Sequence, residues 1–109
     1  MSFSPSDRRV LHWVPGSPWA RDGLARALAE AAPGDVVLLL QDAVVAALAD
    51  ARLPAALDAA LGTRELAVCA ADLAARGLAG APLRAGARAI DDAGMVVLAA
   101  ACDVSCTWA

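Results

Sequence analysis

The sequence predicts an α/β fold: a three-layer α/β/α sandwich around a mainly parallel sheet of about five strands. Short apolar runs alternate along the chain with alanine-rich helical segments, which is typical of a parallel sheet with helices on both faces. Residues 36–40 form an unbroken run of branched aliphatic side chains, as expected of a strand that is covered on both faces. Turn residues such as Pro33-Gly34 separate the segments.

Five segments predict the strands, at residues 10–14, 36–40, 65–70, 87–90 and 104–108. The first helix is expected to begin at Ser17-Pro18, with serine as its N-cap and proline at its first position, and to end at Pro33-Gly34. Its inner face would carry Leu24, Leu28 and Ala31.

Residues typical of helix ends predict the remaining helices. Asp42 is expected to cap a short helix over residues 43–49, and Gly62 to end a helix over residues 52–61. Residues 72–77 predict one or two helical turns and residues 79–86 a loop. Asp91 is expected to cap a last helix that runs to about Ala101.

The length of 109 residues suits one compact domain, expected at residues 10–109 and preceded by a flexible extension at residues 1–9. No apolar run approaches the roughly 20 residues of a membrane span, and the N-terminal region is too broken by polar residues and proline for a signal peptide. A cytoplasmic protein without membrane contact is therefore expected.

The charge pattern excludes several functions. The net charge is −3, and all nine basic residues are arginines that are scattered along the chain. Direct binding of a nucleic-acid backbone is therefore not expected, because it requires a basic stripe. The absence of lysine excludes Schiff-base chemistry and a P-loop.

The three cysteines, Cys69, Cys102 and Cys106, lie in the second half of the chain and form no Cys-x-x-Cys pair. An odd number argues against a disulfide framework, and the one histidine, His12, is distant in sequence, so neither a metal site nor a cofactor is predicted. Cys69 lies in an apolar strand and Cys102 at a helix end that raises a thiol pKa, which favours structural roles. Cys106, beside Ser105 and Thr107, is the better of two weak candidates for a reactive thiol, Cys102 being the other.

Several motifs in order resemble the TusB/DsrH family, over residues 11–108. They are Leu11-His12, Ser17-Pro18-Trp19, Leu38-Leu39-Leu40-Gln41-Asp42, the segment from Asp72 to Leu78 that reads Asp-Leu-Ala-Ala-Arg-Gly-Leu, Ile90-Asp91 with Val96 and Leu98, and Trp108. The chain departs from the family at Ala43, Asp92 and Met95, where the family usually has glycine, an aromatic residue and phenylalanine.

The resemblance implies a fold of the DsrEFH-like, flavodoxin-like type and a subunit of a sulfur-relay complex. Such a subunit assembles with TusC/DsrF-like and TusD/DsrE-like paralogues into a heterohexamer that passes persulfide sulfur to a TusE/DsrC-like carrier. In one branch the sulfur reaches 2-thiouridine in tRNA, and in the other it feeds dissimilatory sulfur oxidation. The DsrH branch has a cysteine on the first helix, near Ala27 here, and its absence favours the tRNA branch.

The resemblance therefore implies that this subunit has no catalytic residue of its own and is not an enzyme by itself. His12 is expected to be a structural histidine with satisfied hydrogen bonds. The candidate interface residues are Trp19, Gln41, Asp42 and Trp108: two aromatics near the surface, and two polar residues at the carboxyl end of a strand.

Two alternatives remain. The chain could carry persulfide itself through Cys106 or Cys102. It could instead be a stand-alone flavodoxin-like binding module, although the turn at Pro15-Gly16 lacks the glycine pattern of a dinucleotide site.

Overall fold

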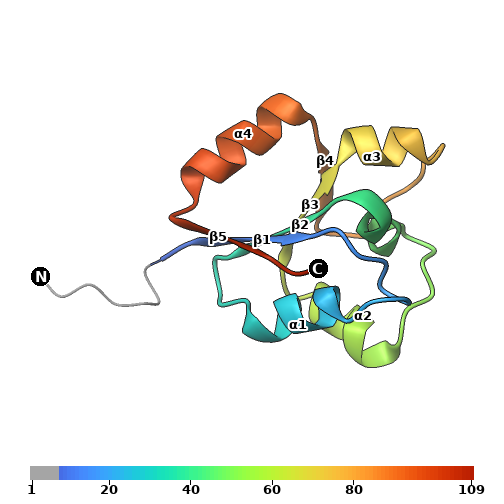
Figure 1. Cartoon of the computed structure of the whole chain (residues 1–109). Coiled ribbons are helices and arrows are strands. Elements are labelled where there is room, and N and C mark those ends of the chain that lie inside the picture. Colours follow the sequence, from blue (N-terminus) through green and yellow to red (C-terminus); the bar gives the residue numbers. More distant parts are fainter. Residues whose placement is uncertain (1–7) are drawn as a thin grey trace, which may run out of the picture.

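The computed structural model describes residues 8–109 as one parallel sheet with helices on both faces (Figure 1). The elements follow in the order β1 (Val10–Val14), α1 (Gly23–Glu30), β2 (Val36–Leu39), the 3₁₀ helix η2 (Gln41–Ala47), α2 (Ala55–Leu61), β3 (Glu65–Cys69), α3 (Ala70–Ala75), β4 (Ala87–Ile90), α4 (Asp92–Ala101) and β5 (Val104–Thr107). Residues 1–7 of the expected N-terminal extension lie outside the described residues.

The sheet has the strand order β4-β3-β2-β1-β5, and each neighbouring pair is parallel. The predicted α/β fold with a five-stranded parallel sheet is therefore confirmed. β2 lies at the centre, and its four residues are completely buried, as its unbroken aliphatic sequence predicted. Within residues 8–109, no helix is long and apolar enough to cross a membrane.

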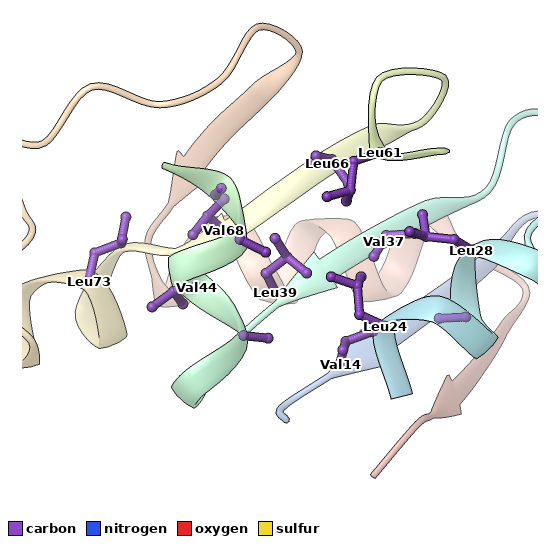
Figure 2. Close-up of a cluster of buried hydrophobic side chains, with 14 residues drawn as sticks. Val14, Leu24, Leu28, Val37, Leu39, Val44, Leu61, Leu66, Val68 and Leu73 are labelled. Atoms are coloured by element: carbon purple, nitrogen blue, oxygen red, sulfur yellow. The ribbon is translucent and has the colours of Figure 1, made fainter. Parts of the chain in front are cut away.

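The larger core lies on the face of the sheet that α1 and α2 cover, which we call the α1 face (Figure 2). Val14 and Val37 lie beside Leu24 and Leu28 of α1 there, and Val68 of β3 lies nearer to η2 (Figure 2). η2 adds Val44 at the carboxyl end of the strands, and α3 adds Leu73 beside it.

On the opposite face, which we call the α4 face, α4 packs against the sheet (Figure 1). Leu98 of α4 packs there against Leu11, Val36 and Leu38 of the central strands. Trp13 is partly buried at the side of this smaller cluster.

Two helix starts differ from the prediction. Ser17 does cap backbone amides, since its Oγ accepts hydrogen bonds from the amides of Trp19 and Ala20, at 3.2 and 3.4 Å. These belong to an isolated turn, and α1 begins later, at Gly23. α2 begins after Pro54, whose ring prevents the preceding residues from continuing as a helix.

Other boundaries agree more closely. Asp91 is the N-cap of α4, as predicted, and its Oδ1 accepts from the amide of Gly94 at 2.8 Å. Gly62 does end α2, but in the right-handed α conformation that any residue can adopt. The segment expected as a helix over residues 43–49 is the 3₁₀ helix η2.

Candidate functional site

Gln41 and Asp42 lie where β2 ends, at the carboxyl edge of the sheet, and both are exposed. Gln41 has a backbone φ of 49°, in the left-handed region that costs a non-glycine residue roughly 1 kcal/mol or more. A carboxylate on α3 holds this conformation, because Asp72 Oδ2 accepts from the amide of Gln41 at 2.7 Å. The structure therefore fixes Gln41 through a partner 31 residues further along the chain.

The predicted capping role of Asp42 is wrong. Asp42 lies inside the first turn of η2, and the N-cap is Leu40. Asp42 Oδ1 instead accepts from Arg76 Nη2 at 2.9 Å, with the aspartate side chain 70% exposed. Asp42, Asp72 and Arg76 thus join the ends of β2 and β3 in one polar cluster at the surface. An interface role for Gln41 and Asp42 stays a prediction.

Cys69 lies beside this cluster, at the end of β3, and is buried. Burial raises the pKa of the Cys69 thiol, and the carboxylate of Asp72 adds to this effect, while the amides of Asp72 and Ala71 oppose it without prevailing. The thiol, not the thiolate, is therefore the stable form at neutral pH. Since persulfide formation requires a thiolate, this favours a structural role for Cys69.

The other two cysteines lie elsewhere. Cys102 ends α4 and packs into the α4-face cluster, where burial raises its pKa. Cys106 is partly buried in β5, paired in register with His12 of β1. No group of three or more His, Cys, Asp or Glu side chains in residues 8–109 is placed to hold a metal ion.

His12 is buried on the α1 face of β1, with both ring nitrogens hydrogen bonded. Nδ1 accepts from the indole Nε1 of Trp108 at 3.0 Å, and Nε2 lies 2.9 Å from Asp35 Oδ2. Because the indole can only donate, Nδ1 must be the acceptor, so the ring proton lies on Nε2 and points at Asp35. The predicted satisfied hydrogen bonds of His12 are confirmed.

Asp35 is the residue that the sequence analysis missed. It is 3% exposed and also accepts from the amides of Val10 and Ala32, at 3.0 and 2.9 Å. Burial alone would raise the pKa of Asp35, but the hydrogen bonds from His12 and these two amides outweigh it and lower the pKa of the carboxyl. A buried carboxylate with this many donors is a structural anchor, joining the start of β1 to the turn before β2.

The two tryptophans predicted at interfaces differ in exposure. Trp19 is 58% exposed, and its indole Nε1 donates to the carbonyl oxygen of Arg52 at 3.1 Å. Trp108 is partly buried against the α1-face core, under the guanidinium of Arg26, whose Cζ lies 5.4 Å from the ring centroid. The chain end also packs closely: a Cβ at Gly23 would lie 2.5 Å from the carbonyl oxygen of Trp108. The interface roles of Trp19 and Trp108 stay predictions.

Comparison with known proteins decides the family. A family model described as DsrH-like protein matches residues 16–105. The chain belongs to the DsrH-like family. The resemblance drawn from the sequence is confirmed, and DsrH-like membership supports a role as a sulfur-relay subunit.

The fold of this DsrH-like chain is similar to that of the YchN protein from E. coli, whose crystal structure matches with a TM-score of 0.73 and 16% sequence identity. The match covers 92% of this chain and 98% of the YchN chain. At this identity the likeness concerns the fold. No curated protein matches the sequence significantly.

Proposed function

We propose that this DsrH-like chain is a non-catalytic subunit of a cytoplasmic complex that passes persulfide sulfur to a TusE/DsrC-like carrier. Its partners would be TusC/DsrF-like and TusD/DsrE-like paralogues in a heterohexamer, with persulfide held by the TusD/DsrE-like subunit. The observation that carries the proposal is the state of the thiols. Burial raises the pKa of both Cys69 and Cys102, which is opposite to what a sulfur carrier needs.

The proposed destination of the sulfur is 2-thiouridine at the tRNA wobble position. The supporting feature is Ala27, the position nearest to the cysteine of the DsrH branch. Residue 27 is alanine, so α1 has no thiol at that place. The alternative is a DsrH-type role in dissimilatory sulfur oxidation, and the genes encoded beside this one would distinguish the two branches.

The second candidate is a sulfur carrier that uses Cys106. Cys106 is partly exposed on an edge strand and has His12 as its register neighbour. His12 is, however, already bonded at both nitrogens, so it has no free position from which to activate a thiol.

The test is intact-mass analysis of the purified chain and its paralogues after incubation with a cysteine desulfurase and cysteine. We expect the TusD/DsrE-like subunit to gain one sulfur and this chain to gain none. A gain on this chain that is lost in Cys106→Ser, but kept in Cys102→Ser, would reject the non-catalytic role and establish the second candidate.

A further inference from the structure

Trp108 lies where an open parallel sheet usually holds a ligand. From β1 the chain runs outward through β2 and β3 to β4, and it then returns to place β5 on the other side of β1. The direction of the connections therefore reverses between β1 and β5. In open α/β sheets, ligands bind beside the carboxyl ends of the strands at such a point. Trp108 follows β5 directly and so occupies this position itself.

Several contacts hold the Trp108 side chain and backbone there. The indole Nε1 donates to His12 Nδ1 at 3.0 Å, and the two rings are stacked with their centroids 6.2 Å apart. The guanidinium of Arg26 on α1 lies over the indole, and the Trp108 amide donates to the carbonyl oxygen of Trp13 at 2.9 Å. The Trp108 carbonyl oxygen lies so close to Gly23 that a side chain at Gly23 would collide with it.

Cys106 is the neighbour of His12 on the same face of the sheet. The two residues are paired in register between β5 and β1, and neighbouring strands lie about 4.8 Å apart. Cys106 and Trp108 are two residues apart, so their side chains point to the same face. Because Trp108 reaches Nδ1 from the end of β5, Nδ1 is the ring nitrogen on the side of that strand. Trp108 thus occupies the acceptor that the Cys106 thiol would use.

Asp35 provides the third group of this arrangement. Its Oδ2 lies 2.9 Å from His12 Nε2, and both side chains are buried. The hydrogen bonds that lower the pKa of Asp35 keep its carboxyl ionised at neutral pH. A nucleophile, a base beside it and a carboxylate that orients the base are the parts of an activated thiol. Cys106, His12 and Asp35 follow one another in that order.

We propose that Cys106, His12 and Asp35 form a latent nucleophilic site that Trp108 keeps inactive. When the indole leaves Nδ1, the thiol proton moves to this nitrogen, which gives a thiolate on Cys106 and an imidazolium that Asp35 stabilises. The thiolate then attacks a soft electrophile: a bond forms to the sulfur, and the leaving group departs with the electron pair of its own bond. This inference goes beyond the relay role and does not depend on it. The inactive form agrees with a subunit that gains no sulfur.

The test is the rate at which iodoacetamide alkylates each cysteine of the full chain, followed by peptide mass spectrometry. Iodide is the leaving group, and Cys102 is the reference within the same molecule. Trp108→Phe removes the indole donor, and we expect Cys106 to react about tenfold faster or more at pH 7 than in the wild type. At pH 10 an ordinary thiol is ionised without a base, so the two rates should differ much less.

Two further variants separate activation from simple exposure. His12→Gln keeps an amide donor for Asp35 but provides no base, so in the Trp108→Phe background it should remove the gain at pH 7. Arg26→Gln changes an exposed residue and loosens the indole without removing it, and should accelerate Cys106 by about two- to fivefold. The matched control is Trp13→Phe, a partly buried tryptophan on the α4 face, which should leave the Cys106 rate unchanged. Circular dichroism checks that each variant is folded.

The outcomes decide between a latent site and a passive chain end. The proposal is rejected if neither Trp108→Phe nor Arg26→Gln accelerates Cys106, if the gain is as large at pH 10 as at pH 7, or if it persists with His12→Gln. It is also rejected if Trp13→Phe accelerates Cys106 as strongly. If Cys102 accelerates in parallel in Trp108→Phe, that variant has opened generally, and the result for Arg26→Gln decides.

Discussion

The two faces of the sheet bury their apolar side chains to different extents. On the α1 face, two α-helices and η2 cover the strands, and Val37, Leu39 and Val44 are completely buried. On the α4 face, α4 inserts Leu98 into the core while its valines remain exposed. The α1 face is therefore covered more completely than the α4 face. We infer that the α1 face supplies most of the folding free energy.

The largest expected difference between the faces comes from leucine truncation. Leu39→Ala removes a completely buried side chain from between β2 and its helices, and should cost about 3–5 kcal/mol of unfolding free energy. Leu98→Ala on α4 should cost less, about 2–3 kcal/mol, because α4 can shift into the space. Urea unfolding of the isolated chain measures both. Equal losses would contradict the difference between the faces.

The polar anchor of the α1 face gives the next prediction. Asp35→Asn removes a buried carboxylate that accepts from His12 and two amides, and should cost about 2–3 kcal/mol at pH 7. Trp108→Phe is the milder comparison, since it keeps a six-membered aromatic ring and removes the pyrrole ring with its N–H donor to His12. Urea unfolding again measures both. If Asp35→Asn costs no more than Trp108→Phe, Asp35 is not the anchor.

The pH dependence of the same anchor has a defined sign. The pKa of Asp35 is lower in the folded chain than its ordinary value of 3.8, so the folded state binds its proton less readily. The stability that the ionised Asp35 carboxylate contributes is complete when the pH is above this ordinary value. It is lost as the pH falls through the lowered pKa of the folded state. In Asp35→Asn, stability should fall less steeply than in the wild type below about pH 4. If the stability of the wild type and that of Asp35→Asn fall equally steeply with pH, this account is contradicted.

Local signals in the sequence predicted the fold well and the polar contacts poorly. The run at residues 36–40 showed a buried strand because it contains no polar side chain, and Asp91 showed a helix start because its cap bond is made within three residues. Asp42 looked like the same kind of cap, but Arg76, 34 residues away, provides its partner instead. A polar side chain can bond to a neighbour in the sequence or to a residue that the fold brings close. The sequence pattern indicates only the first kind of partner.

The missed anchor has the same physical cause. Asp35 follows a turn glycine, a place where aspartate is common for local reasons. Its role depends on the parallel pairing of β1 with β2, which brings His12 to it across 23 residues. The signal that could have found it was its position directly before a buried strand, next to the strand of His12, since buried polar side chains there need partners.

A smaller effect is expected where α4 begins. Asp91→Ala removes the side chain that accepts from the amide of Gly94, and should cost about 1 kcal/mol. The neighbouring Asp92→Ala keeps this cap and should cost less than about 0.5 kcal/mol, through the helix dipole alone. Thermal unfolding of both variants measures the difference. Equal effects would indicate that α4 is held by its packing on the sheet rather than by its cap.

The smallest expected effect is the sharpest test of the comparison, because it concerns a valine that should not matter to folding. Val97→Ser in the isolated chain should change the unfolding free energy by less than about 0.5 kcal/mol, since this side chain is already 69% exposed and serine and valine have similar helix propensities. The matched substitution on the other face, Val44→Ser in η2, places a hydroxyl at a completely buried position and should cost about 2 kcal/mol or more. A large loss for Val97→Ser would mean that the outer side of α4 contributes to folding, contrary to the difference in burial between the two faces.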